Sequence, residues 1–523
     1  MAKPRIAVFS GPTSTVANSP TLVTSRKARL PGDRPLEGRY DHLAAQVLYE
    51  PVTVRVRRYS AHPLEADAKH LYVDDGTEYY EVELRPEDGP YLLPYMGRRA
   101  DGTEHGAPFE EADLHNPALG YGGRQFFYPD ASRVFEEIDR TVSGRDGHGE
   151  GNILDRMADF SFVRALPPGG YTGQGEVSGV DYFPYKPFAI SHQAPPGALA
   201  RVTNTVAKTL SSGDYAGAIW LEGSPTVEET TYWLSIVIGS DLPVVGVAAQ
   251  RPHGELANDG DRNIVDAVTY IVSGQGNGMG AVGILDQQIF AARELKKGDA
   301  RPGGYKATGG HGGVLGTIGP PVTLWYAPTY KRGATSDVRV DLWPDAHETV
   351  YGPIPIKDAD GALLPSAVPY VHVVKSAAYM SVDPFGDPDA EVDIIARIEK
   401  GVADRRSVDP AVPKLHGFVM EGLNPYGSGT DSQMSALRLA AFHGIPTVTV
   451  GRADPGGRVP QRSGDVFVQG SNLDANKARL LLMASLLKLG PLPVAKDPRN
   501  PTADERRATL AKVGQFQAIF ETH

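Results

Sequence analysis

The sequence of 523 residues contains no cysteine. This absence excludes disulfide bonds, thiolate metal sites and a cysteine nucleophile. An excess of positive charge is also missing, because 52 lysines and arginines face 63 aspartates and glutamates, which gives a net charge of −11. Binding to nucleic acid phosphates requires a basic surface, so we do not expect nucleic acid as a partner.

Long apolar runs are equally absent. The apolar stretch at residues 5–9 is far too short for a signal peptide or a membrane span, and no other stretch approaches the length of a transmembrane helix. We therefore expect a cytoplasmic protein without a membrane partner.

Motifs for nucleotides and metals are missing as well. The sequence has no G-x-x-x-x-G-K-[ST] loop, and its 14 histidines form no H-E-x-x-H motif or close H-x-H pair. The glycine-rich residues 274–280 follow an expected helix rather than a strand, which argues against a dinucleotide site. These absences leave chemistry carried by hydroxyl, amine and carboxyl groups, with no metal and no cofactor expected.

The composition, with 41% apolar and 22% charged residues, is typical of a soluble globular protein. From about residue 187 the pattern alternates between short apolar strands and amphipathic helices, which predicts an α/β fold with a parallel sheet covered on both faces. The expected strands are 5–9, 215–221, 242–248 and 281–285, followed by 370–374, 417–420 and 447–450. The expected helices are 198–210, 226–238, 263–272, one through 434–440, 474–489 and 502–520.

This pattern predicts two domains. The first is residues 1–318, with an insertion of short strands and loops at about 60–185. Residues 319–364 are rich in proline and irregular, as expected for a linker with elaborations. Residues 365–523 form the second, smaller α/β domain.

The most informative segment, W-L-E-G-S-P-T-V-E-E-T at 220–230, places Ser224 at a turn between a strand and a helix. Thr226 and Glu229 have the spacing of a capping box at the start of that helix. Free backbone N–H groups of the first turn could receive a carbonyl or carboxylate of a ligand. The alternative is an ordinary capped helix without a functional role.

Ligands of parallel sheets bind beyond the carboxyl ends of the strands. Hydroxyl-rich loops follow three expected strands, at residues 10–15, at residues 224–226 and in the glycine-rich turn after Met420. A hydroxyl nucleophile needs a nearby base, and Lys296 or Lys297 could supply an amine whose burial lowers its pKa. A solvated pair of surface lysines is the alternative interpretation.

The order of these motifs resembles the bacterial-type L-asparaginase/glutaminase family. The first family motif, T-G-G-T-I-A, is matched by S-G-P-T at 10–13, and the second, H-G-T-D-T-M-E-E-T, by E-G-S-P-T-V-E-E-T at 222–230. The family's M-R-P…A-D-G-x-x-N is similar to Q-R-P at 250–252 with N-D-G-D-R-N at 258–263. G-R-D-V-x-K resembles A-R-E-L-K-K at 292–297, and L-x-P-x-K-A-R-x-L-L resembles residues 473–482.

The resemblance implies a large N-terminal flavodoxin-like α/β domain and a smaller C-terminal α/β domain. It also implies active sites formed between subunits of a homodimer or homotetramer, and no cofactor. Thr13 falls on the nucleophile, with Thr15 as the alternative nucleophile, and Tyr40 is the candidate for the assisting loop tyrosine. Ser224 and Lys297 fall on the hydroxyl and amine that relay protons while an acyl-enzyme forms and is hydrolysed.

Departures from the family pattern concern the substrate. Pro225 stands where the family has an aspartate that holds the substrate's α-ammonium group, and Gly223, two residues earlier, is a further candidate for substrate binding. His192 and Gln193 stand where the family has a serine–glutamine clamp for the substrate carboxylate. We therefore expect an amide substrate without a free α-ammonium group.

Two alternatives remain open. One is true L-asparaginase or glutaminase activity, with the ammonium held by Glu222 or Asp465. The other is a non-catalytic amide-binding protein or an amidotransferase subunit.

Overall fold

The computed structural model describes residues 3–11, 157–162, 196–224, 226–251, 259–309, 311–452, 459–460 and 464–523. For residues 10, 159–162, 261 and 311 this description covers the backbone alone. It also gives the backbone of six short strands, which pair as hairpins: β2 (Arg29–Leu30), β3 (Arg34–Pro35), β4 (Tyr40–Asp41), β5 (Gln46–Val47), β6 (Val52–Val56) and β7 (Tyr80–Leu84).

The larger sheet has the strand order β16-β15-β12-β11-β10-β9-β1-β8. Its five neighbouring strands β8, β1, β9, β10 and β11 are all parallel. Counted along the chain, they follow the order 2-1-3-4-5 of flavodoxin-like sheets. The predicted α/β fold is confirmed. The strands are β1 (Arg5–Ser10), β8 (Asp159–Phe162), β9 (Gly217–Leu221), β10 (Val244–Val247), β11 (Ala281–Leu285), β12 (Gln288–Ala291), β15 (Val314–Thr317) and β16 (Thr323–Leu324).

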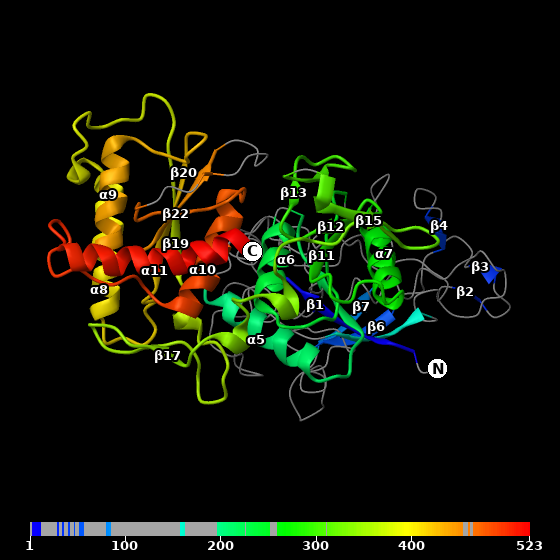
Figure 1. The fold of residues 1–523 in the computed structure, drawn as a ribbon. Helices are drawn as coiled ribbons and strands as arrows, with labels where there is room; N and C mark the ends of the chain where they lie inside the picture. Colours follow the sequence, from blue (N-terminus) through cyan, green and yellow to red (C-terminus); the bar gives the residue numbers. More distant parts are fainter. Residues whose placement is uncertain are drawn as a thin grey trace.

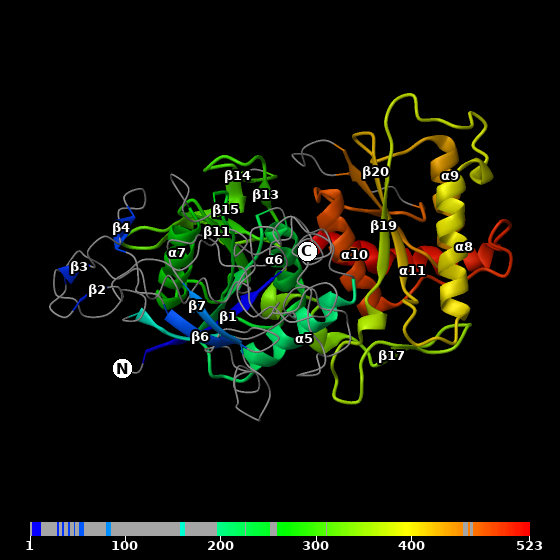
Figure 2. The same ribbon diagram turned by 180° about the vertical axis from the view of Figure 1, so that it is seen from behind.

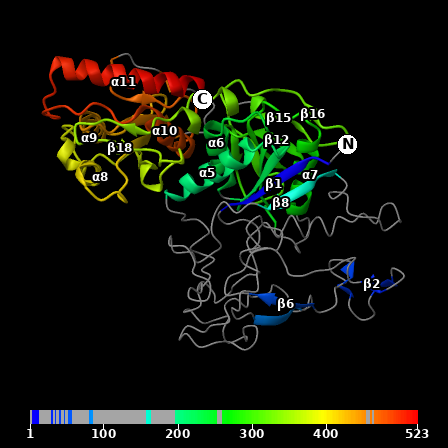
Figure 3. The ribbon, with the colours of Figure 1, turned by 90° about the horizontal axis from the view of Figure 1, so that it is seen from below.

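Helices cover both faces of this sheet, as its continuous apolar strands require. Alternate side chains point to opposite faces. Phe9 and Trp220 join the core formed with α5 (Ala198–Ser211) and α6 (Val227–Val237), whereas Val8 and Ile219 join the core formed with α7 (Gly260–Val272). Figure 3 shows β1 and β8 side by side at one edge of the sheet.

A second sheet of four parallel strands, in the order β19-β20-β21-β22, follows in the chain. Its helix α10 packs against β19 and β20 and also against α6 of the first sheet, so the two parts meet at these helices (Figures 1 and 2). The elements are β19 (Tyr370–Lys375), α8 (Val392–Arg406), β20 (His416–Gly422), α9 (Asp431–Phe442), β21 (Thr447–Gly451), β22 (Val468–Gln469), α10 (Ala475–Leu489) and α11 (Ala503–Thr522).

The structure also contains short elements that the sequence pattern did not predict. A hairpin of β13 (Leu295–Lys297) and β14 (Tyr305–Ala307) lies over the first sheet, and β8 comes from within the segment expected to be an insertion. Strands of two to four residues are too short for a periodic signal. The remaining elements are η8 (His311–Gly313), η9 (Gly333–Thr335), η10 (Val340–Leu342), β17 (Ala346–His347), β18 (Ile354–Pro355), η11 (Pro365–Ala367) and η12 (Pro388–Ala390).

The capping box predicted for α6 is wrong. Thr226 is the N-cap residue, but its side chain makes no capping hydrogen bond. Its hydroxyl bonds to the buried Glu222 instead, and Glu229 forms an ion pair with Arg479 of α10 at 3.0 Å. Tertiary partners have therefore replaced the local ones. At α11, in contrast, Thr502 and Glu505 do form the reciprocal capping box.

Candidate active site

Ser224 lies at the carboxyl edge of the larger sheet, three residues after β9 ends. The carbonyl of Gly223 accepts hydrogen bonds from the backbone N–H groups of Thr226 and Val227, at 3.0 and 3.2 Å. These two N–H groups are therefore already engaged, in contrast to the expectation that the first turn would offer them to a ligand. The same bonds fix the turn, and Ser224 is 7% exposed.

The β13–β14 hairpin brings Lys297 to Ser224. The Nζ of Lys297 donates a hydrogen bond to the Oγ of Ser224, which in turn donates to Gln250 Oε1 at 3.2 Å. From β14, the hydroxyl of Tyr305 donates to the backbone carbonyl of Ser224 at 3.1 Å. Three elements far apart in the sequence thus hold one serine between an amine and an amide.

Burial lowers the pKa of Lys297, although the negative charges of Glu228, Asp259 and Asp299 oppose that shift. A lower pKa increases the fraction of neutral amine, which is the form that accepts a proton. A hydrogen-bonded hydroxyl and amine of this kind can move protons to or from a reacting group.

The neighbouring Lys296 has a different environment. Its Nζ contacts Glu228 Oε1 at 2.9 Å and Asp474 Oδ2 at 3.3 Å. Burial alone would lower the pKa of Lys296, but the charges of Asp474 and Glu228 outweigh burial and raise it. Of the two lysines that the sequence offered as a base, only Lys297 has a lowered pKa and contacts Ser224.

Asp259 holds the segment that carries Gln250. Its carboxylate accepts the backbone N–H groups of Gln250, at 3.0 Å, and of Arg251, at 2.9 Å. Asn263 ties the same turn to β10, because its Nδ2 donates to Ala248 O at 2.9 Å and to Asp259 Oδ2 at 3.3 Å. Asp259 and Asn263 therefore help to place Gln250 against Ser224.

Glu222 is a buried carboxyl group next to this site, and it is 1% exposed. Burial raises its pKa to about 7, although hydrogen bonds with Thr230, Trp220 and Thr226 act in the opposite direction. The indole Nε1 of Trp220 donates to Glu222 Oε2 at 2.6 Å. From the sequence, Glu222 was predicted only as an alternative ligand for the substrate's ammonium group. The apolar strand before it and the threonines after it were the available signal for burial.

Gly11 begins the loop in which the nucleophile is expected. Its N–H donates to Leu221 O of β9 at 2.6 Å. A Cβ at this position would lie 2.7 Å from the indole of Trp220, closer than real Cβ atoms approach other atoms, so glycine is required for this approach. Gly11 and the end of β9, which leads into the turn with Ser224, therefore lie side by side.

Several predicted site residues lie outside the described residues: Thr13, Thr15, His192, Gln193 and Pro225. For Tyr40 the structure gives only the backbone of β4. The structure brings together Gly223, Ser224 and Lys297, and the catalytic roles of all these residues stay predictions.

Among the residues that the structure describes, no group of three or more His, Asp or Glu side chains could hold a metal ion. None of the described helices is long and apolar enough to cross a membrane.

Residues 185–303 match the family model of the N-terminal domain of asparaginase. This range contains Ser224, Gln250 and Lys297. Glutaminase-asparaginase of Acinetobacter glutaminasificans is 30% identical over 136 residues, which is 26% of this chain and 39% of that protein. L-asparaginase 2 of Bacillus subtilis is 32% identical over 99 residues, which is 19% of this chain and 26% of that protein. The chain thus spans well under half the length of these curated relatives.

A longer match, at 23% identity, covers 58% of this chain and 71% of the probable periplasmic L-asparaginase of Haemophilus influenzae. The crystal structure of a probable cytoplasmic L-asparaginase from Campylobacter jejuni aligns with a TM-score of 0.47 and 21% identity, over 68% of this chain and 92% of that one. The family match and the related sequences agree with the motifs and with the Ser224–Lys297 pair that they position. Residues 185–303 of this chain thus match the N-terminal domain of asparaginase, and the chain is similar to L-asparaginases and glutaminase-asparaginases.

Proposed function

We propose that this chain is an amide hydrolase of asparaginase type, in which Ser224 and Lys297 relay protons during acyl transfer. The observation that carries the proposal is the hydrogen bond from Lys297 Nζ to Ser224 Oγ at the carboxyl edge of the sheet. The lowered pKa of Lys297 favours the neutral amine, as a proton acceptor requires. The related proteins are amidohydrolases that act on carbon–nitrogen bonds of linear amides.

The nucleophile of the proposal is Thr13, with Thr15 as the alternative and Tyr40 as the assisting tyrosine. Two residues of chain span at most about 7 Å and four about 14 Å, which limits how far Thr13 and Thr15 can lie from Gly11. Gly11 is bonded to the strand that carries Ser224, which supports this placement. As the threonine oxygen attacks the amide carbon, its hydroxyl proton passes through Ser224 to the neutral Lys297, and the relay returns this proton to the nitrogen as the C–N bond breaks. Water hydrolyses the resulting ester.

The proposed substrate is an amide without a free α-ammonium group, which His192 and Gln193 would help to bind. The carboxylates around Lys297 already have donors, since Glu228 accepts from Lys296 and from the backbone N–H of Lys297, and Asp259 accepts from the backbone of residues 250 and 251. A substrate ammonium would compete with these donors, and Pro225 offers no carboxylate in their place.

True L-asparaginase or glutaminase activity is the second candidate, because relatives carry these names. It requires another carboxylate, Glu222 or Asp465, to hold the ammonium. Glu222 is already engaged by an indole and two threonine hydroxyls, which disfavours it. A Pro225→Asp variant that gains asparagine turnover would support our substrate argument, whereas efficient turnover of asparagine by the unaltered protein would contradict it.

The deciding experiment measures release of ammonia or amine from a panel of linear amides. We expect turnover of at least one N-acylated or non-amino-acid amide, and its loss in Thr13→Ala and Lys297→Met. Loss of turnover in Thr15→Ala but not in Thr13→Ala would identify Thr15 as the nucleophile. If the unaltered protein releases nothing from any amide, the alternative of a non-catalytic amide-binding protein or an amidotransferase subunit gains the support that the hydrolase loses.

We also infer a homodimer or homotetramer in the cytoplasm. The assembly follows from the family resemblance. Analytical ultracentrifugation tests the assembly, since a monomer at micromolar concentration would contradict it. Fractionation of the source cells tests the location.

A further inference from the structure

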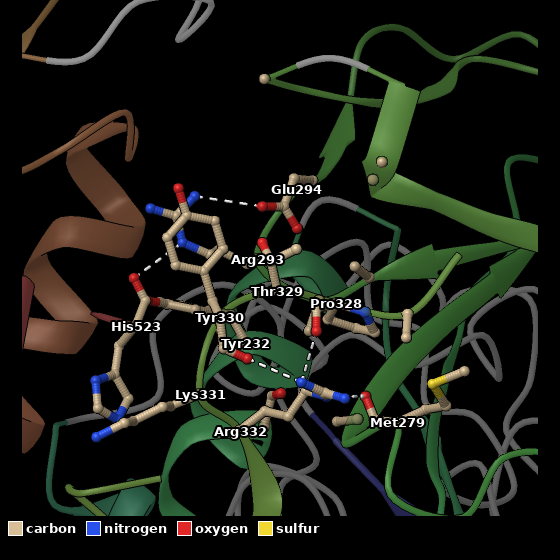
Figure 4. Close-up of a pocket in the computed structure, with 18 of the residues that line it drawn as sticks. Tyr232, Met279, Arg293, Glu294, Pro328, Thr329, Tyr330, Lys331, Arg332 and His523 are labelled. Atoms are coloured by element: carbon tan, nitrogen blue, oxygen red, sulfur yellow. Dashed lines mark hydrogen bonds and ion pairs between the residues drawn. The ribbon is translucent and has the colours of Figure 1, made fainter. Parts of the chain in front are cut away.

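The chain that leads into β13 is fixed before it reaches the site. The side chain of Arg293 is buried, and its Nε donates to the backbone oxygen of His523 at 2.9 Å (Figure 4). Its Nη1 contacts Glu294 Oε1 at 3.3 Å, and the ring of Tyr330 lies 3.7 Å from the guanidinium carbon. Because this side chain is held on three sides, Lys297 enters the site from a fixed direction.

The turn between β13 and β14 is tied to Gln250. The side-chain Nε2 of Gln250 donates a hydrogen bond to the backbone oxygen of Asp299 in this turn, at 2.8 Å. A backbone oxygen can only accept, so only the nitrogen end of the amide group can bind it. The orientation of the amide is therefore defined, and its oxygen is the end that faces Ser224.

The orientation of Gln250 determines the direction of the Ser224 hydroxyl. The Oε1 of Gln250 lies 3.2 Å from Ser224 Oγ and, as an amide oxygen, can only accept a hydrogen bond. A serine hydroxyl has a single proton, and this bond uses it. The hydrogen bond between Lys297 Nζ and Ser224 Oγ can therefore form only with the lysine as the donor. The three side chains thus form one directed chain, from Lys297 through Ser224 to Gln250.

This direction is the reverse of the one that the proposed relay needs. Lys297 can take a proton from Ser224 only after the hydroxyl has turned from Gln250 toward the amine. A hydrogen bond between two neutral groups is weak enough to permit such a turn. Ser224 is 7% exposed, so few water molecules compete for its proton. The resting site therefore holds the hydroxyl proton on the side away from the amine.

We propose that Gln250 is a positioning residue that holds the proton of Ser224 away from Lys297 in the resting site and releases it when the relay acts. The proposal rests on the proposed function, because it assigns a role within the same relay. Gln250 stands in a Q-R-P segment where the similar family motif is M-R-P. A methionine sulfur accepts hydrogen bonds only weakly, so the glutamine adds a control that the family motif does not provide.

The pKa of Lys297 reports on this role. While the hydroxyl of Ser224 is bound to Gln250, it can accept from the ammonium of Lys297 but cannot donate to the neutral amine. Removal of the acceptor lets the hydroxyl donate to the neutral amine, which favours that form and should lower the pKa of Lys297 further. A substitution of Gln250 leaves in place the charges of the described residues that act on this amine, which belong to Glu228, Asp259 and Asp299.

Trace acetylation of the full chain with acetic anhydride, from neutral to alkaline pH, measures this pKa without any need for turnover. Only the neutral amine reacts, and peptide mass spectrometry reads each lysine separately. Gln250→Met should lower the pKa of Lys297 by about 0.5–1. Gln250→Glu keeps an acceptor and adds a negative charge, so it should raise the pKa. Where an amide is turned over, the acid limb of the kcat/KM profile should move in the same directions.

Two controls accompany the variants. Lys296 does not contact Gln250, so its pKa should stay the same in both. Gln275→Met is the matched substitution, because Gln275 also donates to a backbone oxygen, at 3.1 Å, but lies in the turn after α7. It should leave the pKa of Lys297 unchanged.

An unchanged or raised pKa of Lys297 in Gln250→Met would overturn the proposal, since a substitution that merely admits water would raise it. If that variant fails to fold, an unchanged or lowered pKa in Gln250→Glu would overturn the proposal instead. Absence of turnover together with the expected pKa shifts would contradict the proposed function alone. Turnover without these shifts would contradict the role of Gln250 alone.

Discussion

The two lysines of β13 are adjacent in sequence but belong to different regions of the molecule. Lys297 points to the turn after β9 and contacts Ser224, whereas Lys296 bonds to Glu228 of α6 and Asp474 at the start of α10. Burial lowers the pKa of Lys297, and ion pairs raise that of Lys296. One strand thus supplies a candidate base to the site and a structural cation to the junction of the two sheets.

The difference shows how a lysine becomes suited to proton transfer. The ammonium of Lys296 has two carboxylate partners within 3.3 Å, so its charge is stabilised. Lys297 instead has a hydroxyl partner, and carboxylates act on it only through their charges. A chemical role for Lys297 and a structural role for Lys296 can therefore be separated by substitution.

The largest expected effect is on turnover in Lys297→Met. Loss of the amine should lower kcat/KM for the best amide about 10²–10⁴-fold, as is typical when a general acid–base group is removed. The unfolding temperature should change little, because the methionine keeps most of the apolar part of the side chain. Lys296→Met is the control, and it should keep turnover within about tenfold. A larger loss in Lys296→Met than in Lys297→Met would reverse the comparison.

The second expected effect is on the pH dependence of the free energy of unfolding, and it comes from Glu222, which is buried next to the site with Ser224. Glu222 has a pKa of about 7 in the folded protein against a reference value of 4.5. The contribution of Glu222 to the free energy of unfolding is therefore fully present below pH 4.5. It is lost as the pH rises through 7, and the loss is about 3 kcal/mol in total. Denaturant unfolding of the unaltered protein and of Glu222→Gln between pH 4 and 8 measures this difference. Parallel curves for the two proteins would show that Glu222 does not titrate in this range.

The third effect is on stability at the junction of the sheets. Lys296→Met removes the cation between Glu228 and Asp474 and leaves two largely buried carboxylates without it. We expect a loss of about 2 kcal/mol in the free energy of unfolding, measured by urea denaturation. Arg507→Gln is a suitable control, because Arg507 pairs with Asp504 on the exposed face of α11 and should contribute under 1 kcal/mol. Equal losses of stability in both variants would show that Lys296 contributes no more than an exposed ion pair.

The smallest effect is expected for Thr226→Ala, which loses a hydrogen bond to Glu222 rather than a helix cap. Stability should fall by about 1 kcal/mol near pH 8, where Glu222 is ionised, and by less at pH 5. Urea denaturation at the two pH values distinguishes this role from a cap, because loss of a cap would cost the same at both.

The main elements around the site could be predicted from sequence, because their apolar periodicity is local. The strand before Ser224, the helix after it and the motif with Lys297 are all visible in the printed chain. The hairpin that turns Lys297 toward Ser224 could not be predicted, since β13 has three residues and its partner β14 lies beyond a loop. The junction depends on pairs such as Glu229–Arg479, 250 residues apart, for which a single sequence carries no signal.

The burial of Lys477 could not be predicted from the sequence either. Nothing in the pattern around Lys477 distinguishes it from a surface lysine of a helix, yet it is 1% exposed and its Nζ donates to Arg293 O at 2.8 Å and also to Leu295 O. This contact holds the segment that leads into β13. The position of Lys297 therefore depends on a helix of the second sheet.

A double-substitution cycle tests whether Ser224 and Lys297 act as one proton relay. The quantity measured is kcat/KM for the best amide in Ser224→Ala, Lys297→Met and the variant that carries both. Groups that act as a unit give non-additive losses, so the double variant should be no more than about threefold slower than the slower single variant. Losses that multiply in the double variant would show that the two residues act independently, and that the hydrogen bond between them is not a relay.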